Sequence, residues 1–149
     1  NDGDKDERLG FRHELASALA WLAHHGTEPN ANLVAFLIAA HHGKVRGSIR
    51  SLPNEIPPPD PTIRFARGIW NGDILPPVQL DNGEPVPATS LDLSLMELGE
   101  STFGPSWLSR VLGLRDGRDL GPFRLSFLEM LLRVADWRGS KAGENQNDQ

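Results

Sequence analysis

Three histidines and one aspartate stand at positions where a helix is expected to be buried. They are His13, His41, His42 and Asp136. An ionisable side chain is costly in a buried position unless it is paired or binds a metal ion, so the combination is more informative than any single member. Imidazole and carboxylate are ligands that divalent transition metals accept. The residue types therefore predict a metal-dependent hydrolase.

The composition limits the other chemistry that is open to the chain. Its 149 residues fit one compact domain with a hydrophobic core. The absence of cysteine excludes disulfides, thiolate zinc sites and a cysteine nucleophile. With 20 acidic and 15 basic residues, the chain lacks a broadly basic surface for coating nucleic acid, although a local basic rim is compatible with these totals. No apolar run approaches the roughly 20 residues that cross a bilayer, so we expect a soluble protein with no membrane partner, and the absence of cysteine favours a cytoplasmic one.

Two helices near the start of the chain are predicted to position the histidines. Apolar residues recur at helical spacing over residues 7–24, and Gly26 is the expected C-cap. A second helix is expected to begin at Asn30 or Asn32 and to continue to Gly43. This second helix is apolar on every face, which is typical of a helix in the middle of a domain. It would carry the adjacent histidines from the core to the rim of a cleft.

A long irregular segment is expected after the second helix. Residues 43–104 are rich in Pro and Gly, which favours loops and short strands and excludes a long helix. The Asn-Gly pair at 82–83 predicts a hairpin between residues 78–80 and 84–86. Pro85 would restrict the pairing to an edge strand.

The last third of the sequence returns to a helical pattern. Pro105 is predicted to open a short helix, which ends at Gly113 or Gly117. A long helix is predicted over residues 122–138. Residues 141–149 are rich in Gly, Asn, Gln and charge, so we expect a disordered tail there. The predicted fold class is mainly α.

Asp136 is predicted to project from the edge of the apolar stripe of the last helix. It follows Leu132 by four residues, and the stripe consists of Leu125, Leu128, Leu132 and Ala135. An unpaired carboxylate there would be costly, whereas one that meets a cation is tolerated. An ion pair with Arg133 or Arg138 is an equally good interpretation from position alone.

Each pair of adjacent histidines has two interpretations. Consecutive helical residues point about 100° apart, so His41 and His42 can share one cation only if another helix supplies further ligands. His13 is the obvious third ligand. A His-His pair more often lies at the end of a helix, where it interacts with the helix dipole, and His24-His25 is assigned to that class.

Three segments together resemble a known family. Arg12-His13-Glu14, His41-His42-Gly43-Lys44 and Ala135-Asp136-Trp137-Arg138 occur in this order over nearly the whole chain. They resemble the HD superfamily of metal-dependent phosphohydrolases. Within it, the chain is most similar to the HD nuclease module of the CRISPR type I helicase-nuclease, particularly forms that carry this module at the C-terminal end. The motifs are moderately specific together and weak separately.

The resemblance implies a fold, an activity and a set of metal ligands. It implies a helical HD domain that holds two divalent transition metal ions (Mn, Ni, Co, Fe or Zn) and cleaves single-stranded DNA. The implied partners are a helicase domain or chain, which feeds the strand, and the CRISPR surveillance complex. By the matching motifs, His13, His41 and His42 would hold one metal ion, and Asp136 would hold the other.

Lys44, Arg46 and Trp70 are the candidate contacts with substrate. Lys44 and Arg46 follow the histidines and could contact a phosphate, although basic residues in such a position more often belong to an ordinary solvated loop. Trp70 lies in a Gly-rich stretch near two arginines and could stack on an exposed base. Tryptophans flanked by leucine, such as Trp107 and Trp137, are more often core residues.

The chain departs from the family pattern at the dyad that gives the family its name. The aspartate of a His-Asp pair would bridge the two metal ions, and the sequence contains no His-Asp dipeptide. His13-Glu14 is a poor substitute, because glutamate is longer and the spacing after it fits the later motif better. We therefore expect residues 1–140 to be the C-terminal portion of an HD domain. Without the missing N-terminal HD segment it would bind metal weakly and cleave little.

Two alternatives from other functional classes stay open. An HD-type nucleotide phosphohydrolase would share the metal ligands but would need a closed pocket of the size of a base. A non-catalytic helical interaction module would keep the fold without any chemistry.

Overall fold

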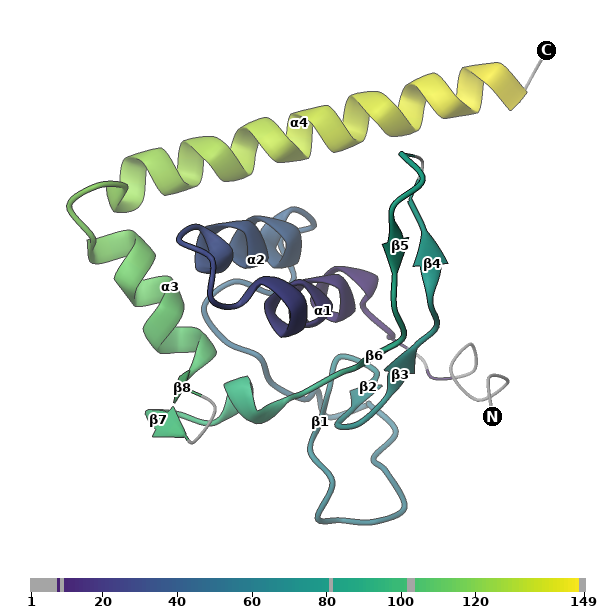
Figure 1. The fold of residues 1–149 in the computed structure, drawn as a ribbon, viewed down its shortest axis with the longest axis vertical. Coiled ribbons are helices and arrows are strands. Elements are labelled where there is room, and N and C mark those ends of the chain that lie inside the picture. Colours follow the sequence, from purple (N-terminus) through teal and green to yellow (C-terminus); the bar gives the residue numbers. More distant parts are fainter. Residues whose placement is uncertain (1–7, 9, 81, 102–103, 148–149) are drawn as a thin grey trace.

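Two antiparallel helices form the centre of the molecule (Figure 1). A computed structural model describes residues 8, 10–80, 82–101 and 104–147 of the chain. Helix α1 spans His13–His25 and α2 spans Ala31–Ala40, and the two pack against each other. Helices α3 (Trp107–Asp116) and α4 (Gly121–Asn147) follow a long segment of loops and short strands. The prediction of a mainly helical protein is confirmed.

Helix α1 begins about six residues later than its apolar pattern predicts. Gly10 has a φ of +94°, which breaks the helix, and Arg12 has an extended backbone. The N–H of Arg12 donates to the carbonyl of Arg67 at 3.0 Å. Gly68 lies so close to this segment that a Cβ on it would be 2.5 Å from the Cα of Phe11. A loop distant in sequence therefore sets where α1 starts, and with it the position of His13.

Helix α2 is central, as its uniformly apolar sequence predicts. None of its ten residues is fully exposed, and Ala35, Ala39 and Ala40 are buried. Small side chains allow close approach of helices, and these residues share one core with Leu15 of α1. The helix ends at Ala40 and not at Gly43 as predicted, because a turn follows in which Gly43 has a φ of +72°.

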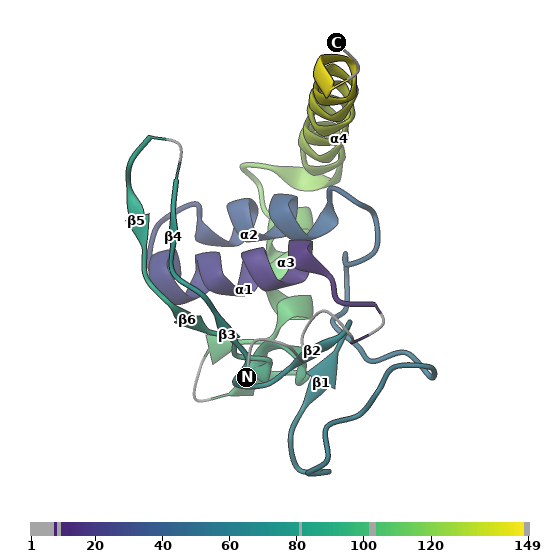
Figure 2. The same ribbon diagram turned by 90° about the vertical axis from the view of Figure 1, so that its right-hand side faces the viewer.

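The described residues between α2 and α3 form short antiparallel ladders and no long helix, as predicted. The pairs are β1 (Phe65–Ala66) with β2 (Ile69–Trp70), β3 (Ile74–Leu75) with β6 (Thr89–Ser90), β4 (Val78–Gln79) with β5 (Pro85–Val86), and β7 (Glu100–Ser101) with β8 (Gly104–Pro105). A 3₁₀ turn covers Ser94–Met96. The predicted hairpin is confirmed, since Val78 pairs with Val86, and the β3–β6 ladder continues it at its base, where β6 contacts α1 (Figure 2).

Helix α3 has a different start from the one predicted. Pro105 belongs to β8, and Ser106 is the N-cap, whose hydroxyl accepts a hydrogen bond from the N–H of Ser109 at 3.2 Å. Trp107 is buried, and its indole N–H donates to the carbonyl of Arg46 at 2.6 Å. This bond ties α3 to the loop that follows α2. The predicted end at Gly117 is confirmed.

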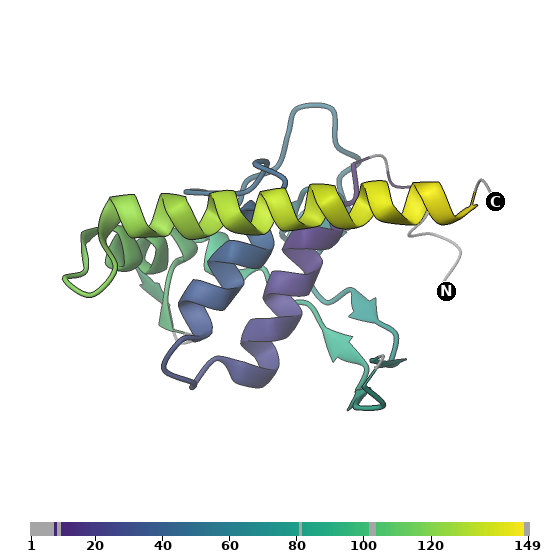
Figure 3. The same ribbon diagram turned by 90° about the horizontal axis from the view of Figure 1, so that it is seen from above.

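Helix α4 is longer than predicted, and over residues 121–141 its buried side chains all lie in the first part. It crosses over the C-terminal end of α2 and continues to Asn147, so the predicted tail is helical over residues 141–147; residues 148–149 lie outside the described part (Figure 3). Lys, Ala, Glu and Gln in this stretch are good helix formers, which explains the extension. Leu125 and Glu129 are buried, whereas every residue over 131–141 is exposed. No helix in the described part of the chain combines the length and the apolar character needed to cross a membrane.

Candidate metal centre

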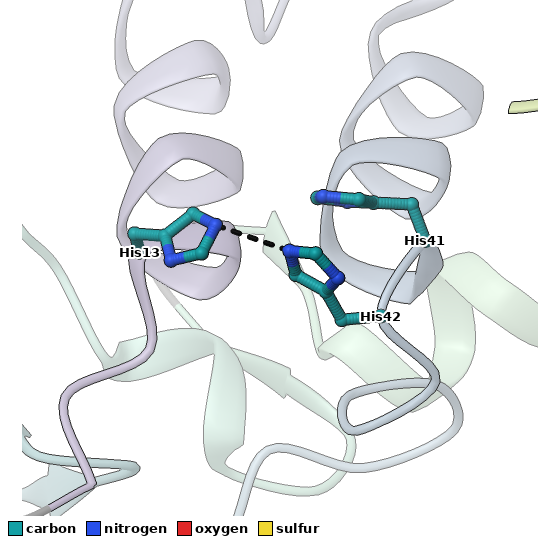
Figure 4. A group of neighbouring side chains, drawn as sticks. All are labelled: His13, His41 and His42. Atoms are coloured by element: carbon teal, nitrogen blue, oxygen red, sulfur yellow. Dashed lines mark hydrogen bonds between the residues drawn. The ribbon is translucent and has the colours of Figure 1, made fainter. Parts of the chain in front are cut away.

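The helical hairpin brings the three predicted histidines together. His13 is the first residue of α1, while His41 and His42 directly follow α2 (Figure 4). Because the helices are antiparallel, the start of α1 lies beside the end of α2. One ring nitrogen from each histidine lies within 4.8 Å of the other two. The cluster can therefore offer three imidazole ligands to a single ion.

The closest approach in the cluster joins His13 and His42. Their Nε2 atoms are 3.2 Å apart, and the rings are nearly perpendicular at 80°. Two imidazole nitrogens that bind one tetrahedral ion at about 2.0–2.1 Å are separated by roughly 3.3 Å. The observed separation fits two ligands of a common metal ion, and it also fits an N–H···N hydrogen bond when no ion is bound.

A backbone contact determines which nitrogen His41 can offer. Its Nδ1 lies 2.5 Å from the carbonyl oxygen of Ile38, one turn earlier. A carbonyl can only accept a hydrogen bond, so Nδ1 must carry the proton and Nε2 keeps its lone pair. In metal-binding histidines, the ring nitrogen that does not bind the metal commonly donates a hydrogen bond to a carbonyl. This bond holds the ring in one tautomer and one orientation.

Glu14 stands behind His13 and is the most unusual side chain near the cluster. It is completely buried, and neither carboxylate oxygen has a hydrogen-bond partner among the described residues. One of its oxygens lies 3.7 Å from Nδ1 of His13, on the opposite edge of the ring from the nitrogen that faces His42. Glu14 does not join the three clustered nitrogens. At 3.7 Å the carboxylate and the imidazole are too far apart for a hydrogen bond, but Glu14 lies on the side of the ring from which carboxylates orient metal-binding histidines.

The burial of Glu14 beside His13 was not predicted from the sequence. The sequence suggested only that Glu14 is a poor substitute for the dyad aspartate. A signal for its burial does exist. Glu14 lies three residues after Phe11 and four before Ala18. Both are apolar residues of the helix that the sequence predicts over residues 7–24. An acidic residue in the apolar stripe of a helix, next to a histidine, is a mark of a buried carboxylate with a role.

Asp136 is not part of the histidine cluster in the structure. It is exposed, as is every residue of α4 over 131–141, which contradicts the prediction that it projects from a buried stripe. In the described part of the chain, no ion pair joins it to Arg133 or Arg138. It lies on the same side of α4 as Leu125, since eleven residues correspond to about three turns. Its role as a ligand of a second ion stays a prediction.

Helix α4 nevertheless lies close to the loop that follows the histidines. A Cβ on Gly43 would lie 3.7 Å from the guanidinium of Arg133. Arg46 of the same loop donates to Glu129 of α4 at 2.5 Å. Arg46, a predicted phosphate contact, is thus already used to hold the loop against α4. Lys44 is exposed and keeps its predicted position beside the cluster.

The remaining predicted residues are less favourably placed for substrate. The ring of Trp70 has the guanidinium of Arg8 at 4.4 Å from its centroid, and its N–H donates to the carbonyl of Ile56. One face of this ring is therefore covered. His24 and His25 lie in the last turn of α1, as predicted, and contact Thr89 and Glu28.

Comparisons of the chain with protein-family models, with curated proteins and with solved structures give no match. The function must therefore be argued from the chemistry of the site. That site is a cluster of three histidines that could hold a divalent metal ion, with a buried carboxylate behind one of them.

Proposed function

We propose that this chain supplies one half of the metal centre of a phosphodiester hydrolase, specifically an HD nuclease that degrades single-stranded DNA in CRISPR type I interference. The convergence of His13, His41 and His42 carries this proposal. Three imidazoles from two helices, two of them with Nε2 atoms 3.2 Å apart, form a donor set suited to Mn, Fe, Co, Ni or Zn. A structural role alone would not require three histidines at one point.

The chain's own residues have distinct parts in this proposal. His13, His41 and His42 hold the first ion, Glu14 orients the ring of His13, and Lys44 contacts a phosphate of the substrate. A bound divalent ion would supply Lewis-acid polarisation of the phosphoryl group and a nucleophile at neutral pH. The three histidines do not fill all the positions around two ions. The second ion needs further ligands, for which Asp136 and a His-Asp dyad from outside these 149 residues are the candidates.

The proposed partners follow from the same interpretation. Single-stranded DNA is the substrate, a helicase domain or chain delivers it, and the CRISPR surveillance complex recruits the assembly. Because the chain has five more acidic than basic residues, it has no broad basic surface to hold DNA by itself. A strand that is delivered by a helicase needs only local contacts at the cleavage point.

Cleavage of a labelled single-stranded oligonucleotide in Mn²⁺ tests the proposal. The chain alone should cleave little, and the chain combined with a segment that carries a His-Asp dyad should cleave the strand. His41→Ala in the combined protein should reduce the rate by at least about a hundredfold, which corresponds to the loss of a metal ligand. His24→Ala, a histidine that contacts Thr89, is the matched control and should retain the rate.

The same assay separates the other functional classes. Unchanged cleavage by His41→Ala would refute the assignment of the histidines. Turnover of mononucleotides without cleavage of DNA would replace the nuclease with a nucleotide phosphohydrolase. If metal ions do not change the melting temperature of the combined protein, the chain is better explained as a non-catalytic helical interaction module.

A further inference from the structure

The outer face of α4 carries a row of apolar side chains that nothing in the described chain covers. Their exposed fractions range from 39 to 82%, and they are Phe123, Phe127, Met130, Val134 and Trp137. The intervals between them are four, three, four and three residues. This is the spacing of the contact seam in a pair of packed helices. We call these five residues the outer stripe.

The outer stripe is separate from the face through which α4 packs on its own chain. Leu125 and Glu129 are the buried residues of α4. At 100° per residue, Leu125 points about 200° away from Phe123. The helix thus has two apolar faces on opposite sides, and its own domain uses one of them. Exposed apolar rows of this size are uncommon on a protein that acts alone.

The charged residues beside the outer stripe are all basic. In a helix pair, the positions that flank the seam on one side are 124, 131 and 138, and those on the other side are 126, 133 and 140. They include Arg124, Arg133 and Arg138 and no acidic residue. Lys141 follows the last residue of the stripe by four positions, and its amine lies 4.0 Å from the centroid of the Trp137 ring. Both flanks and one end of the stripe therefore carry positive charge.

A concavity on this face could receive side chains of a partner. A groove of about 600 Å³ is bounded by Arg46 of the loop after α2 and, on α4, by Ser126, Glu129, Met130, Arg133, Val134 and Trp137. Glu129 pairs with Arg46 inside this groove, so the apolar walls formed by Met130, Val134 and Trp137 suit an apolar side chain of a partner.

We propose that the outer stripe is the docking site for an amphipathic helix that has apolar residues at three- and four-residue spacing and acidic residues on both flanks. The charge of the flanks selects this occupant. A second copy of α4 would bring arginines against arginines, because Arg124 of one copy would approach Arg138 of the other in an antiparallel pair. An acidic helix pairs with the same arginines and buries the same apolar side chains. This inference does not depend on the proposed nuclease function.

Two synthetic helices test the proposal against the full chain. Both are three heptads long with leucine at the seam, and they differ only in having glutamate or lysine at the flanking positions. Fluorescence anisotropy of the labelled peptides should show that the acidic helix binds at least about tenfold more tightly than the basic one. Phe127→Glu should abolish this binding. Leu98→Glu makes the same change at an exposed apolar residue away from α4 and should leave binding unchanged.

Reversal of charge gives a second readout that does not depend on apolar contact. In the variant Arg124→Glu with Arg138→Glu, the preference should invert, so that the basic helix binds more tightly. Equal binding of the two helices to the wild-type chain would overturn the proposal. So would a dimer of the free chain that Phe127→Glu dissociates, since the occupant would then be a second copy. Binding of the stripe to phosphatidylserine vesicles but not to the acidic helix would overturn it in favour of a membrane surface.

Discussion

The α1–α2 hairpin and helix α4 use their apolar residues in different ways. The hairpin buries its apolar side chains within its own domain, and the three histidines stand at its end on a well-packed base. Helix α4 buries only its first part and exposes a complete second apolar face. The difference places the three histidines on a region that is held by its own packing, whereas the exposed face of α4 is where we propose that a partner docks. Substitutions that affect only one of the two regions test this difference.

The largest effect is expected from a truncation in the hairpin core. Leu15 is fully buried, so Leu15→Ala should lower the free energy of unfolding by about 4 kcal/mol through lost burial and a residual cavity. The same truncation in the exposed half of α4, Leu131→Ala, should cost less than about 0.5 kcal/mol. Urea unfolding followed by tryptophan fluorescence measures both. Equal losses in the free energy of unfolding would show that Leu131 is as well packed as Leu15. The two regions would then not differ in packing.

A smaller effect is expected where a loop sets the start of α1. Gly68→Ala places a Cβ 2.5 Å from the backbone of Phe11 at a positive φ, so it should destabilise the chain by about 2 kcal/mol and weaken metal binding by displacing His13. Gly72→Ala is the control, because Gly72 also has a positive φ but has open space around it. It should cost about 1 kcal/mol and leave metal binding unchanged. Equal metal affinities in the two variants would show that the loop around Gly68 does not determine the position of His13.

The smallest effect concerns the carboxylate behind His13. Glu14→Gln removes a buried, unpartnered charge, so the metal-free chain should be as stable as the wild type or more stable. Its metal affinity should nevertheless fall about tenfold, because the carboxylate that lies 3.7 Å from Nδ1 of His13 would no longer orient this ring when the metal binds. Glu28→Gln, which changes the carboxylate beside His25, should leave metal affinity unchanged. A loss of stability with unchanged metal affinity would give Glu14 a purely structural role.

Local patterns in the sequence predict much of this fold. The apolar run of α2 indicates its central position, and the Asn82-Gly83 turn correctly predicts the hairpin between β4 and β5. Gly117 ends α3 as expected, because its signal is also local. The meeting of the three histidines was predictable as well, since it needs only two antiparallel helices joined by a short connection.

Features that depend on contacts distant in sequence were not predictable in the same way. The late start of α1 depends on Gly68, and apolar spacing cannot show that contact. Only one apolar stripe of α4 was predicted, although a second, opposite one is present, because burial depends on how far the rest of the domain extends beneath the helix. The same limit explains why Asp136 is exposed. Leu125 in the first part of α4 is buried as its pattern predicts, whereas every residue over 131–141 is exposed although the apolar pattern continues.

The central claim is that His13, His41 and His42 bind one divalent metal ion. Titration of the full chain with Co²⁺, followed by the visible absorption of the bound ion, tests it directly. The wild-type chain should saturate with one ion per chain, and His42→Ala should abolish saturation. His25→Ala, a change in the other adjacent histidine pair, should titrate as the wild type does. Wild-type binding by His42→Ala, or an equal loss in His25→Ala, would contradict the assignment of the metal site.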